Sequence, residues 1–505
     1  MKGDFSRNTF NSLHHFTRVL MQQGRVQLDS DWNELVSILL YQLRTATADI
    51  IGDHGGPADI PEDEPGGPVE RLGFKIGPPD EGENDFSISQ GHYYIDGLLC
   101  VNDEAHTYKS HSCDEEELDD DGSFLIYLDV WERHLTHLET NYPIREVALN
   151  GPDTASRAQL VCQVKALSSY LDENGEEQET PAGLKQDNED DRDTANDYCE
   201  AWWKHKRLSQ SWRGYMKAML AEESDEDGAC VISPESRYLG LENQLYRVEI
   251  HQGGSAGEAT FKFSRDNGSV IFPLDKAVNG DKIFLKHLGK DDRYSLQKED
   301  WVEVVDDRSV LCQTAEPHKA GDPPIANPLL QILEVDHVDR SVTLSGIPAI
   351  GTDMSLHPIL RRWDHKGINF EDVTDNGDEA HRILKNGAIP IRNLNEDYVL
   401  EEGIFVNFYD GEFDHTDDST ATPPTPQFRA GDYWLIPARV ATGDIEWPPD
   451  KNGNASWLPP HGVDHYYAPL AIITFDGGTL DEGNIISCQK VFHNLTKLYE
   501  LANKE

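Results

Sequence analysis

The chain has 505 residues, of which 37% are hydrophobic, and this length is enough for roughly two to four domains with their own cores. Asp and Glu number 92 against 44 Lys and Arg, and the formal net charge of -48 argues against nucleic acid or an anionic membrane as a partner. No run of about 18 apolar residues and no secretion-signal pattern occurs, so we expect no membrane span and assembly in the cytoplasm. Two interpretations of the acidic charge are equally open. In one it serves solubility alone, and in the other it is an adaptation to a salt-rich medium.

The cysteines are scattered along the chain, odd in number and never arranged as a C-x-x-C pair. This spacing predicts neither a disulfide framework nor a zinc site. We expect buried free thiols for most of them, consistent with a reducing compartment. The seven positions are Cys100, Cys113, Cys162, Cys199, Cys230, Cys312 and Cys488.

The clearest local signal lies in residues 18–52. Asp31, followed three residues later by Glu34, has the form of a capping box at a helix start. Apolar residues then recur at steps of three and four, and Gly52 is placed to end the helix in a left-handed conformation. The spacing predicts a helix of roughly 20 residues. Its apolar stripe comprises Leu35, Ile38, Leu39, Leu43, Ala46 and Ile50.

Short apolar runs between turn residues follow, beyond a Gly- and Pro-rich loop over 53–68. They predict a mainly β, multi-domain α+β fold built from antiparallel β-sandwich or barrel units. The run 124–131 is apolar on both faces, which predicts a central buried strand with 160–166 as its partner. Other strands are expected at 74–76, 86–88, 93–101 with a hairpin turn at 95–98, 244–250, 259–263, 270–272, 282–285, 301–305, 330–335, 341–344, 433–436 and 471–475.

The acidic stretch 172–196 has no core pattern and predicts a solvated insertion. A helix is expected after it, over 198–222. Its tryptophans, Trp202, Trp203 and Trp212, favour packing on their own domain over a partner-binding face.

Composition shifts divide the chain into six parts. These are an N-terminal arm and anchor helix (1–56), a first β domain (57–170), the acidic insertion with the Trp-rich helical segment (171–236), a second β domain (237–412), a C-terminal β unit (413–489) and a C-terminal helix (490–505).

Motifs for chemistry are weak. Residues 253–257 match G-x-S-x-G, but strand patterns on both sides favour a hairpin turn over a nucleophile elbow. Asp129 and Glu132 form the best carboxylate pair, yet an acid in a buried strand is typical of a hydrogen-bonding role. No catalytic residue and no cofactor is therefore assigned.

Two segments carry weak candidates for metal ligands. Asp450, Asn452 and Asn454 place oxygens at alternate positions, as a calcium loop does, but the closing Glu is missing and a solvated turn is favoured. His461 and His465 have i, i+4 spacing, although the Pro and Gly residues around them predict a loop rather than a helix.

Arginine and acid come together in two turn settings, at Arg265 with Asp266 and at Arg362, Trp363 and Asp364. An Arg–Asp pair can hold a loop in place through two parallel hydrogen bonds. We interpret both groups as structural turns rather than as parts of a substrate site.

Several separated motifs occur in one order along nearly the whole chain, at 1–5, 18–34, 127–133, 145–154, 240–251, 261–268, 360–364, 430–439 and 459–470. Together they resemble a family of uncharacterised proteins encoded with phage-tail-like contractile injection systems and phage tail modules. The resemblance implies a structural component at the baseplate periphery or a fibre-like attachment. It implies other particle subunits (baseplate, sheath or fibre proteins) as partners, a homo-oligomer within the assembly, and a cell-surface glycan as a further candidate ligand.

In this hypothesis the N-terminal segment is the assembly interface. Arg18, Leu28, Trp32, Leu35 and Leu39 would lie against a partner subunit or a neighbouring copy. Packing of the helix on the protein's own sheet is the competing interpretation. A tail-associated glycan hydrolase or lyase, or a receptor- or carbohydrate-binding module, is the alternative function.

Overall fold

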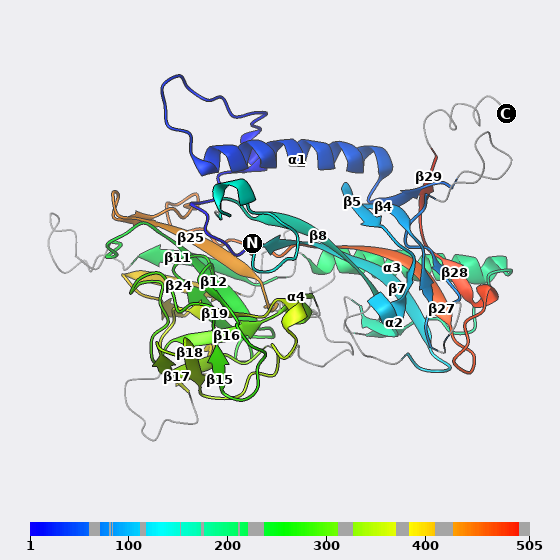
Figure 1. Cartoon of the computed structure of the whole chain (residues 1–505). Coiled ribbons are helices and arrows are strands. Elements are labelled where there is room, and N and C mark those ends of the chain that lie inside the picture. The colour runs from blue at the N-terminus through cyan, green and yellow to red at the C-terminus, as the bar shows by residue number, and fades with distance from the viewer. Residues whose placement is uncertain are drawn as a thin grey trace.

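The fold is mainly β, as the sequence predicts, with several antiparallel sheets and a few helices. Figure 1 shows two lobes side by side, with the long helix α1 (Asp29–Ile51) lying across one side of both. The computed structural model describes residues 1–59, 71–79, 82, 84–111, 118–151, 153–172, 176–210, 213–220, 237–311, 327–369, 383–409 and 428–493.

The first lobe contains two four-stranded sheets and the helix α3 (Glu189–Ser209). One sheet has the order β28-β27-β7-β8 and the other the order β29-β1-β4-β5. A three-stranded sheet, β2-β3-β6, and the hairpin β9-β10 complete the lobe. The bounds are β1 (His54–Pro57), β2 (Ile76–Gly77), β3 (Ser87–Ile88), β4 (Gly91–Ile95), β5 (Leu98–Asn102), β6 (His106–Thr107), α2 (Tyr108–His111), β7 (Ser123–Leu135), β8 (Arg157–Leu167), β9 (Ser169–Leu171), β10 (Glu177–Glu179), β27 (His465–Thr474), β28 (Ile485–Ser487) and β29 (Val491–Phe492).

Strand β7 is the central buried strand that its apolar sequence predicts, and β8 pairs with it antiparallel. Ile126 and Leu128 face a core shared with β4 and β5, whereas Leu125 faces the core under α3. Trp202 and Trp203 are buried in that second core, which confirms packing on their own domain. Both faces of the strand are covered, and this accounts for its nearly continuous apolar sequence.

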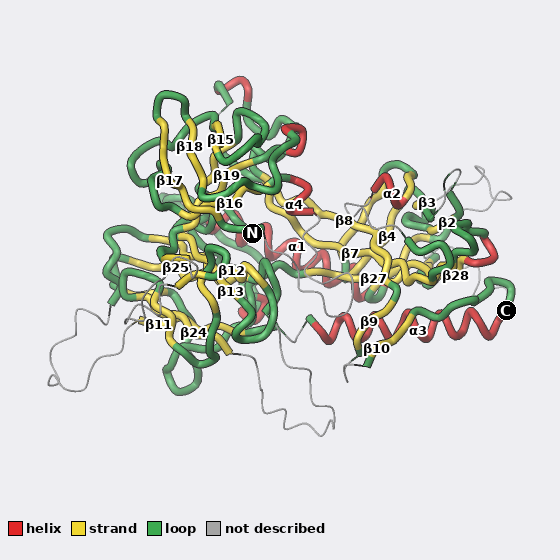
Figure 2. Tube along the Cα trace, turned by 90° about the horizontal axis from the view of Figure 1, so that it is seen from below, coloured by secondary structure: helices red, strands yellow, loops and turns green. Residues whose placement is uncertain are grey.

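The second lobe stacks two larger sheets, as Figure 2 shows. One has the order β22-β13-β12-β25-β26, with β11-β24-β23 beside it, and the other has the order β14-β19-β16-β17-β18-β15. Aromatic residues such as Phe261, Phe408 and Trp434 fill the first core. The bounds are β11 (Tyr215–Leu220), β12 (Gln244–Gln252), β13 (Thr260–Ser264), β14 (Ile271–Pro273), β15 (Lys282–Phe284), β16 (Trp301–Val305), α4 (Asp307–Leu311), β17 (Leu330–Asp336), β18 (Ser341–Leu344), β19 (Ile359–Trp363), β20 (Ile368–Asn369), β21 (Ile383–Leu384), β22 (Ile389–Pro390), β23 (Asp397–Val399), β24 (Ile404–Tyr409), β25 (Tyr433–Arg439) and β26 (Asp444–Ile445).

The helix expected at 198–222 is wrong in position. It begins earlier, at Glu189 inside the stretch predicted to be a solvated insertion, and it ends at Ser209. Acidic side chains in its first turn interact favourably with the positive end of the helix dipole and stabilise the helix. An acidic composition therefore does not prevent the helix from forming. Tyr215 and Met216 lie in strand β11, which pairs with β24 of the second lobe. Trp212 lies outside the described residues.

The C-terminal part of the chain is shared between the lobes. Strand β25 pairs with β12 of the second lobe, whereas β27 pairs with β7 of the first. The described strands of residues 413–489 therefore complete earlier sheets instead of forming the separate unit that we expected. Strand β1 likewise lies within the loop predicted over 53–68, and β29 lies at the start of the predicted C-terminal helix. Residues 494–505 and the predicted loop at 410–427 lie outside the described part.

A disulfide joins Cys199 of α3 to Cys488, which follows β28. Our expectation of free thiols is wrong for these two residues, because the helix folds onto the sheet and brings together cysteines that are 289 positions apart. Cys100 and Cys162 are free, as expected. Cys113, Cys230 and Cys312 are outside the described residues.

None of the helices in the described part of the chain is long and apolar enough to cross a membrane.

Candidate assembly interface

The N-terminal residues are inserted into the second lobe. The Asn267 side chain donates to the carbonyl oxygens of Met1 (3.2 Å) and Gly3 (2.9 Å). The Gly3 amide donates in return to the Asn267 carbonyl at 3.2 Å. Lys2 forms an ion pair with Glu249 at 2.9 Å. These contacts fix residues 1–3 against strand β12 and the turn that follows β13.

Glu249 belongs to a buried group of charges between the two stacked sheets. It pairs with Arg247 at 2.6 Å and with Lys262 at 3.6 Å. Lys262 also pairs with Glu303 at 2.8 Å and lies 4.4 Å from the centre of the Trp363 ring. The Trp363 indole donates to Glu303 at 3.0 Å, so the charges of the group are paired and hydrogen-bonded. We call Arg247, Glu249, Lys262, Glu303 and Trp363 the charged core.

Positive neighbours keep the two carboxylates of the charged core ionised. Burial opposes ionisation of Glu249, but the charges of Lys2, Arg247 and Lys262 hold its pKa well below the usual range. Burial likewise opposes ionisation of Glu303. The positive charges of Lys262 and then Lys2 outweigh this effect and lower the pKa of Glu303 to about 2. The N-terminal residues therefore take part in balancing the buried negative charge.

We call residues 1–9 the root and residues 10–28 the arm. The arm follows the root and projects from the body of the protein (Figure 1). It contains no acid, and its two arginines, Arg18 and Arg25, are exposed. Its apolar side chains are exposed as well, with Leu13 at 78%, Leu20 at 69% and Val26 at 83% of full accessibility. Such side chains are normally covered when a binding partner is present.

Helix α1 follows the arm and begins earlier than predicted. Asp31 is its third residue rather than its N-cap, and the carboxylate of Asp31 accepts the Leu28 amide at 3.3 Å. Gly52 ends the helix with a φ of 97°, but its ψ of -174° is not the left-handed helical conformation that we predicted.

One side of α1 is attached to the body. Ile38 is buried, Arg44 pairs with Glu132 at 2.8 Å, and the Ser6 hydroxyl donates to Asp29 at 2.9 Å. The Thr9 hydroxyl donates to Glu34 at 2.5 Å and holds the root of the arm against the helix. The position of α1 is therefore fixed from both of its ends.

The remaining sides of α1 expose apolar residues next to the arm. Of the predicted interface residues, Arg18, Leu28, Trp32 and Leu39 are exposed and Leu35 is half-buried. The apolar stripe is thus divided, because Ile38 packs on the protein's own body while Leu39 and Leu43 do not. We call the exposed apolar residues of both segments the arm–helix surface: Leu13, Phe16, Leu20, Met21, Val26, Leu28, Trp32, Val36, Leu39, Leu40, Tyr41, Leu43 and Ile50.

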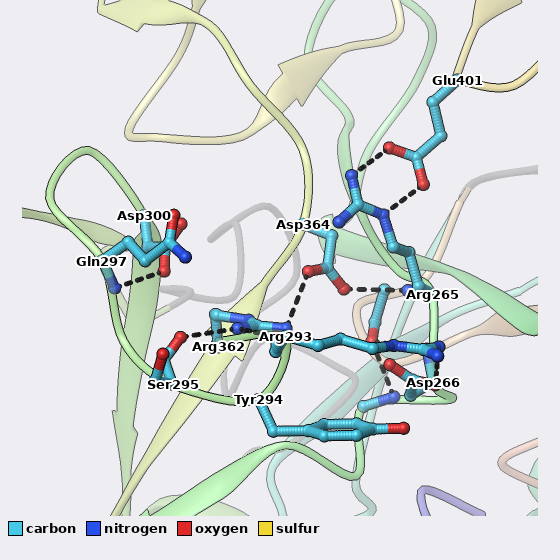
Figure 3. Close-up of polar contacts among 12 residues, drawn as sticks. Arg265, Asp266, Arg293, Tyr294, Ser295, Gln297, Asp300, Arg362, Asp364 and Glu401 are labelled. Atoms are coloured by element: carbon cyan, nitrogen blue, oxygen red, sulfur yellow. Dashed lines mark hydrogen bonds and ion pairs between the residues drawn. The ribbon is translucent and has the colours of Figure 1, made fainter. Parts of the chain in front are cut away.

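The two arginine turns form one polar cluster in the second lobe (Figure 3). The Asp364 carboxylate accepts the Arg265 amide at 2.9 Å and lies 3.4 Å from the Arg362 guanidinium. Nε and Nη2 of Arg265 donate to the two carboxylate oxygens of Glu401, and Asp266 pairs with Arg293 at 3.1 Å. These contacts join both arginine groups into one network of ion pairs and hydrogen bonds.

The setting of this cluster differs from the prediction in one respect. Arg362 and Trp363 lie in strand β19 rather than in a turn, and the Trp363 ring is buried in the charged core. Burial, followed by the nearby charge of Asp364, raises the pKa of Asp266 to about 6.

The weak metal candidates do not converge. Asp450 accepts the amides of Asn452 (2.7 Å) and Asn454 (2.9 Å), so it closes the turn that the sequence favoured. His461 accepts the Leu435 amide at 3.0 Å, whereas His465 pairs with Asp129 at 2.7 Å. No group of three or more metal-binding side chains is found in the described ranges.

Asp129 and Glu132, the carboxylate pair singled out in the sequence, bind different partners. Asp129 is bound by Lys165 at 2.7 Å as well as by His465, and Glu132 is bound by Arg44. Residues 253–257 form the connection between the antiparallel strands β12 and β13, as predicted. Each of these motifs therefore has a structural partner within the protein.

The sequence reasoning missed the charged core. A signal was available, because Arg247, Glu249 and His251 alternate with apolar or aromatic residues in the interior of one strand. Alternation of this kind places the charges on one face of the strand. Because all of β12 except its two end residues is buried, these charges had to meet partners from another strand.

Comparison with known proteins gives a family and no function. A model described as "Family of unknown function (DUF6519)" matches residues 1–199 and 178–502. No curated protein and no solved structure matches the chain.

Proposed function

The chain belongs to the DUF6519 family of unknown function, and we propose that it is a structural component of a contractile injection system or phage-tail-like particle. In this proposal it lies at the baseplate periphery or forms a fibre-like attachment. The particle context comes from the motif resemblance, and the molecular basis comes from the arm–helix surface.

The exposed apolar side chains of the arm–helix surface carry the proposal. Leu20 of the arm exposes 69% of its accessible surface, and Leu39 and Leu43 of α1 expose 54% and 63%. A chain with a net charge of -48 gains solubility from charge, and this many exposed apolar residues in one segment work against it. Burial against another subunit removes that cost.

The attachment of the arm also supports an assembly role. Residues 1–3 are held by Asn267 and Glu249, and α1 is held by Arg44 and Ile38. The arm is therefore presented from two fixed points. A preformed binding segment loses less conformational entropy on association than a free tail does.

The role is structural rather than catalytic in this proposal. The buried acids Asp129, Glu249 and Glu303 are each held in internal ion pairs with lysine or arginine. Positive neighbours lower the pKa of each of these carboxylates, so the three acids stay ionised near neutral pH and are poorly suited to exchange protons with a substrate.

The test uses single substitutions in the full chain. Removing residues 1–52 would also remove Lys2 and Gly3, whose contacts lie in the second lobe, so loss of assembly would have two explanations. Leu20→Asp and Leu39→Asp place a charge on the arm–helix surface and leave the root unchanged. Val338→Asp is the matched control, because Val338 is 93% exposed in a turn of the second lobe.

Each variant is expressed together with its neighbouring particle genes, and particles are purified and analysed by mass spectrometry. We expect Leu20→Asp and Leu39→Asp to be lost from fractions that contain sheath, tube and baseplate proteins, while Val338→Asp is retained. Retention of both arm–helix variants at the wild-type level would refute the proposal. Release of oligosaccharides from envelope polysaccharide by the purified protein would favour the enzymatic alternative.

A further inference from the structure

The arm carries positive charge on a strongly acidic chain. Residues 5–28 include Arg7, Arg18 and Arg25 and contain no Asp or Glu, whereas the chain as a whole has a net charge of -48. Arg7 is bound by Glu446 at 2.9 Å. Within the described part of the chain, the exposed side chains of Arg18 and Arg25 form no ion pair. The arm therefore offers two unpaired positive charges between apolar side chains.

These charges decide which contacts between subunits are favourable. Two acidic bodies repel each other, and so do two cationic arms. A cationic arm and an acidic body attract each other. In its own copy the arm projects from the body beside the start of α1 (Figure 1), and a second copy offers further acidic surface that its charges favour.

Helix α1 provides an apolar site for such an arm. Leu39, Leu40 and Leu43 are exposed along it, and the acids Asp29, Asp31 and Glu34 occupy its first two turns. Leu20 and Met21 lie between Arg18 and Arg25 in the arm. The arm thus has apolar residues between basic ones, and the helix has exposed apolar residues that follow acidic ones along its length.

Resting on the function proposed above, we propose that the arm–helix surface joins copies of this chain, with the arm of one copy bound over α1 of the next. The contact is heterologous, because each copy gives an arm and receives one through different surfaces. Such contacts build closed rings when the rotation between copies closes and open filaments when it does not.

The test measures the mass of the purified full-length protein by sedimentation and light scattering. We expect the wild type to associate at concentrations up to roughly 100 μM, where even weak contacts are populated. Leu20→Asp and the double variant Arg18→Glu/Arg25→Glu should each weaken association roughly tenfold or more, because residues at the centre of an interface dominate its affinity. Val338→Asp should associate as the wild type does.

A photo-crosslinking residue at Leu20 locates the contact. In a mixture of isotope-labelled and unlabelled protein, we expect crosslinks from the arm of one copy to α1 of the other. A wild-type protein that stays monomeric over the whole concentration range would overturn this inference. So would crosslinks that occur only within one copy.

The two proposals fail in different ways. A monomeric wild type that still enters particles, with entry lost in Leu20→Asp, overturns the contact between copies and leaves the assembly role in place. Association of purified copies combined with normal particle entry of Leu20→Asp refutes the assembly role and supports the contact.

Discussion

Removing the negative charge of Glu249 tests whether the charged core holds the root of the arm. Glu249→Gln keeps the shape of the side chain and leaves Arg247, Lys262 and Lys2 with one fewer negative partner. Because Glu249 is buried and lies 2.6 Å from Arg247 and 2.9 Å from Lys2, the loss leaves positive charge uncompensated away from water. Breaking a buried pair on one side costs about 3–5 kcal/mol.

The assay is calorimetry of the full chain at neutral pH. In a domain of this size each kcal/mol lowers Tm by about 2–4 °C, so the transition of the second lobe should fall by roughly 6–20 °C. Hydrogen exchange of the Gly3 amide, which is bonded to the Asn267 carbonyl, should become faster as the root loosens. These two readouts connect the stability of the lobe with the attachment of the arm.

Glu446→Gln is the matched control. Glu446 also binds two arginines, Arg7 and Arg439, but its side chain is 37% exposed. Exposed pairs contribute about 0–1 kcal/mol, so its Tm should change little. A Tm shift for Glu249→Gln that is no larger than the shift for Glu446→Gln would refute our account of the charged core.

Four further predictions concern pH, packing, the disulfide and salt. The pKa of Glu303 falls from an ordinary value of 4.5 to about 2 in the folded state, so its ionised form adds stability that is lost as pH falls from about 4.5 through about 2. Tm should drop more over this range in the wild type than in Glu303→Gln, and equal drops would contradict the assignment. Gly97→Ala should destabilise the contact between the β4–β5 turn and α1, because Gly97 has a φ of 78° and a Cβ there would overlap the Arg44 carbonyl. We expect a cost of about 1–3 kcal/mol by chemical denaturation, against about 1 kcal/mol for Gly453→Ala, which meets no atom within 4 Å. Reduction of the Cys199–Cys488 disulfide should lower the stability of the first lobe by about 2–5 kcal/mol. The Tm of Cys199→Ser, which lacks the disulfide, should not respond to reductant, and a response in that variant would show that the effect has another cause. Raising the salt concentration should raise Tm, because screening weakens repulsion within a chain of charge -48, and a Tm that is independent of salt would remove the interpretation of salt adaptation.

The sequence determined most of the local structure. Period-two alternation located the strands of the second lobe, and the turn at Asp96 and Gly97 adopts the positive φ values that the hairpin requires. The run 124–131, apolar on both faces, correctly indicated a central strand. For the candidate interface, the sequence identified Arg18, Leu28, Trp32 and Leu39, which are exposed in the structure. These results depend on residues a few positions apart, where backbone geometry fixes the pattern.

The tertiary structure decided what the local pattern leaves open. Tyr215 and Met216 follow a helix but join a strand, because their partner strand β24 lies far along the chain. Glu249 meets Lys262 and Glu303, and Cys199 meets Cys488, only after sheets and helix have packed. Ile38 and Leu39 are neighbours on one apolar stripe, yet only Ile38 is buried. A repeat of apolar residues specifies that a face exists, whereas the surface that covers it depends on contacts between segments distant in the sequence.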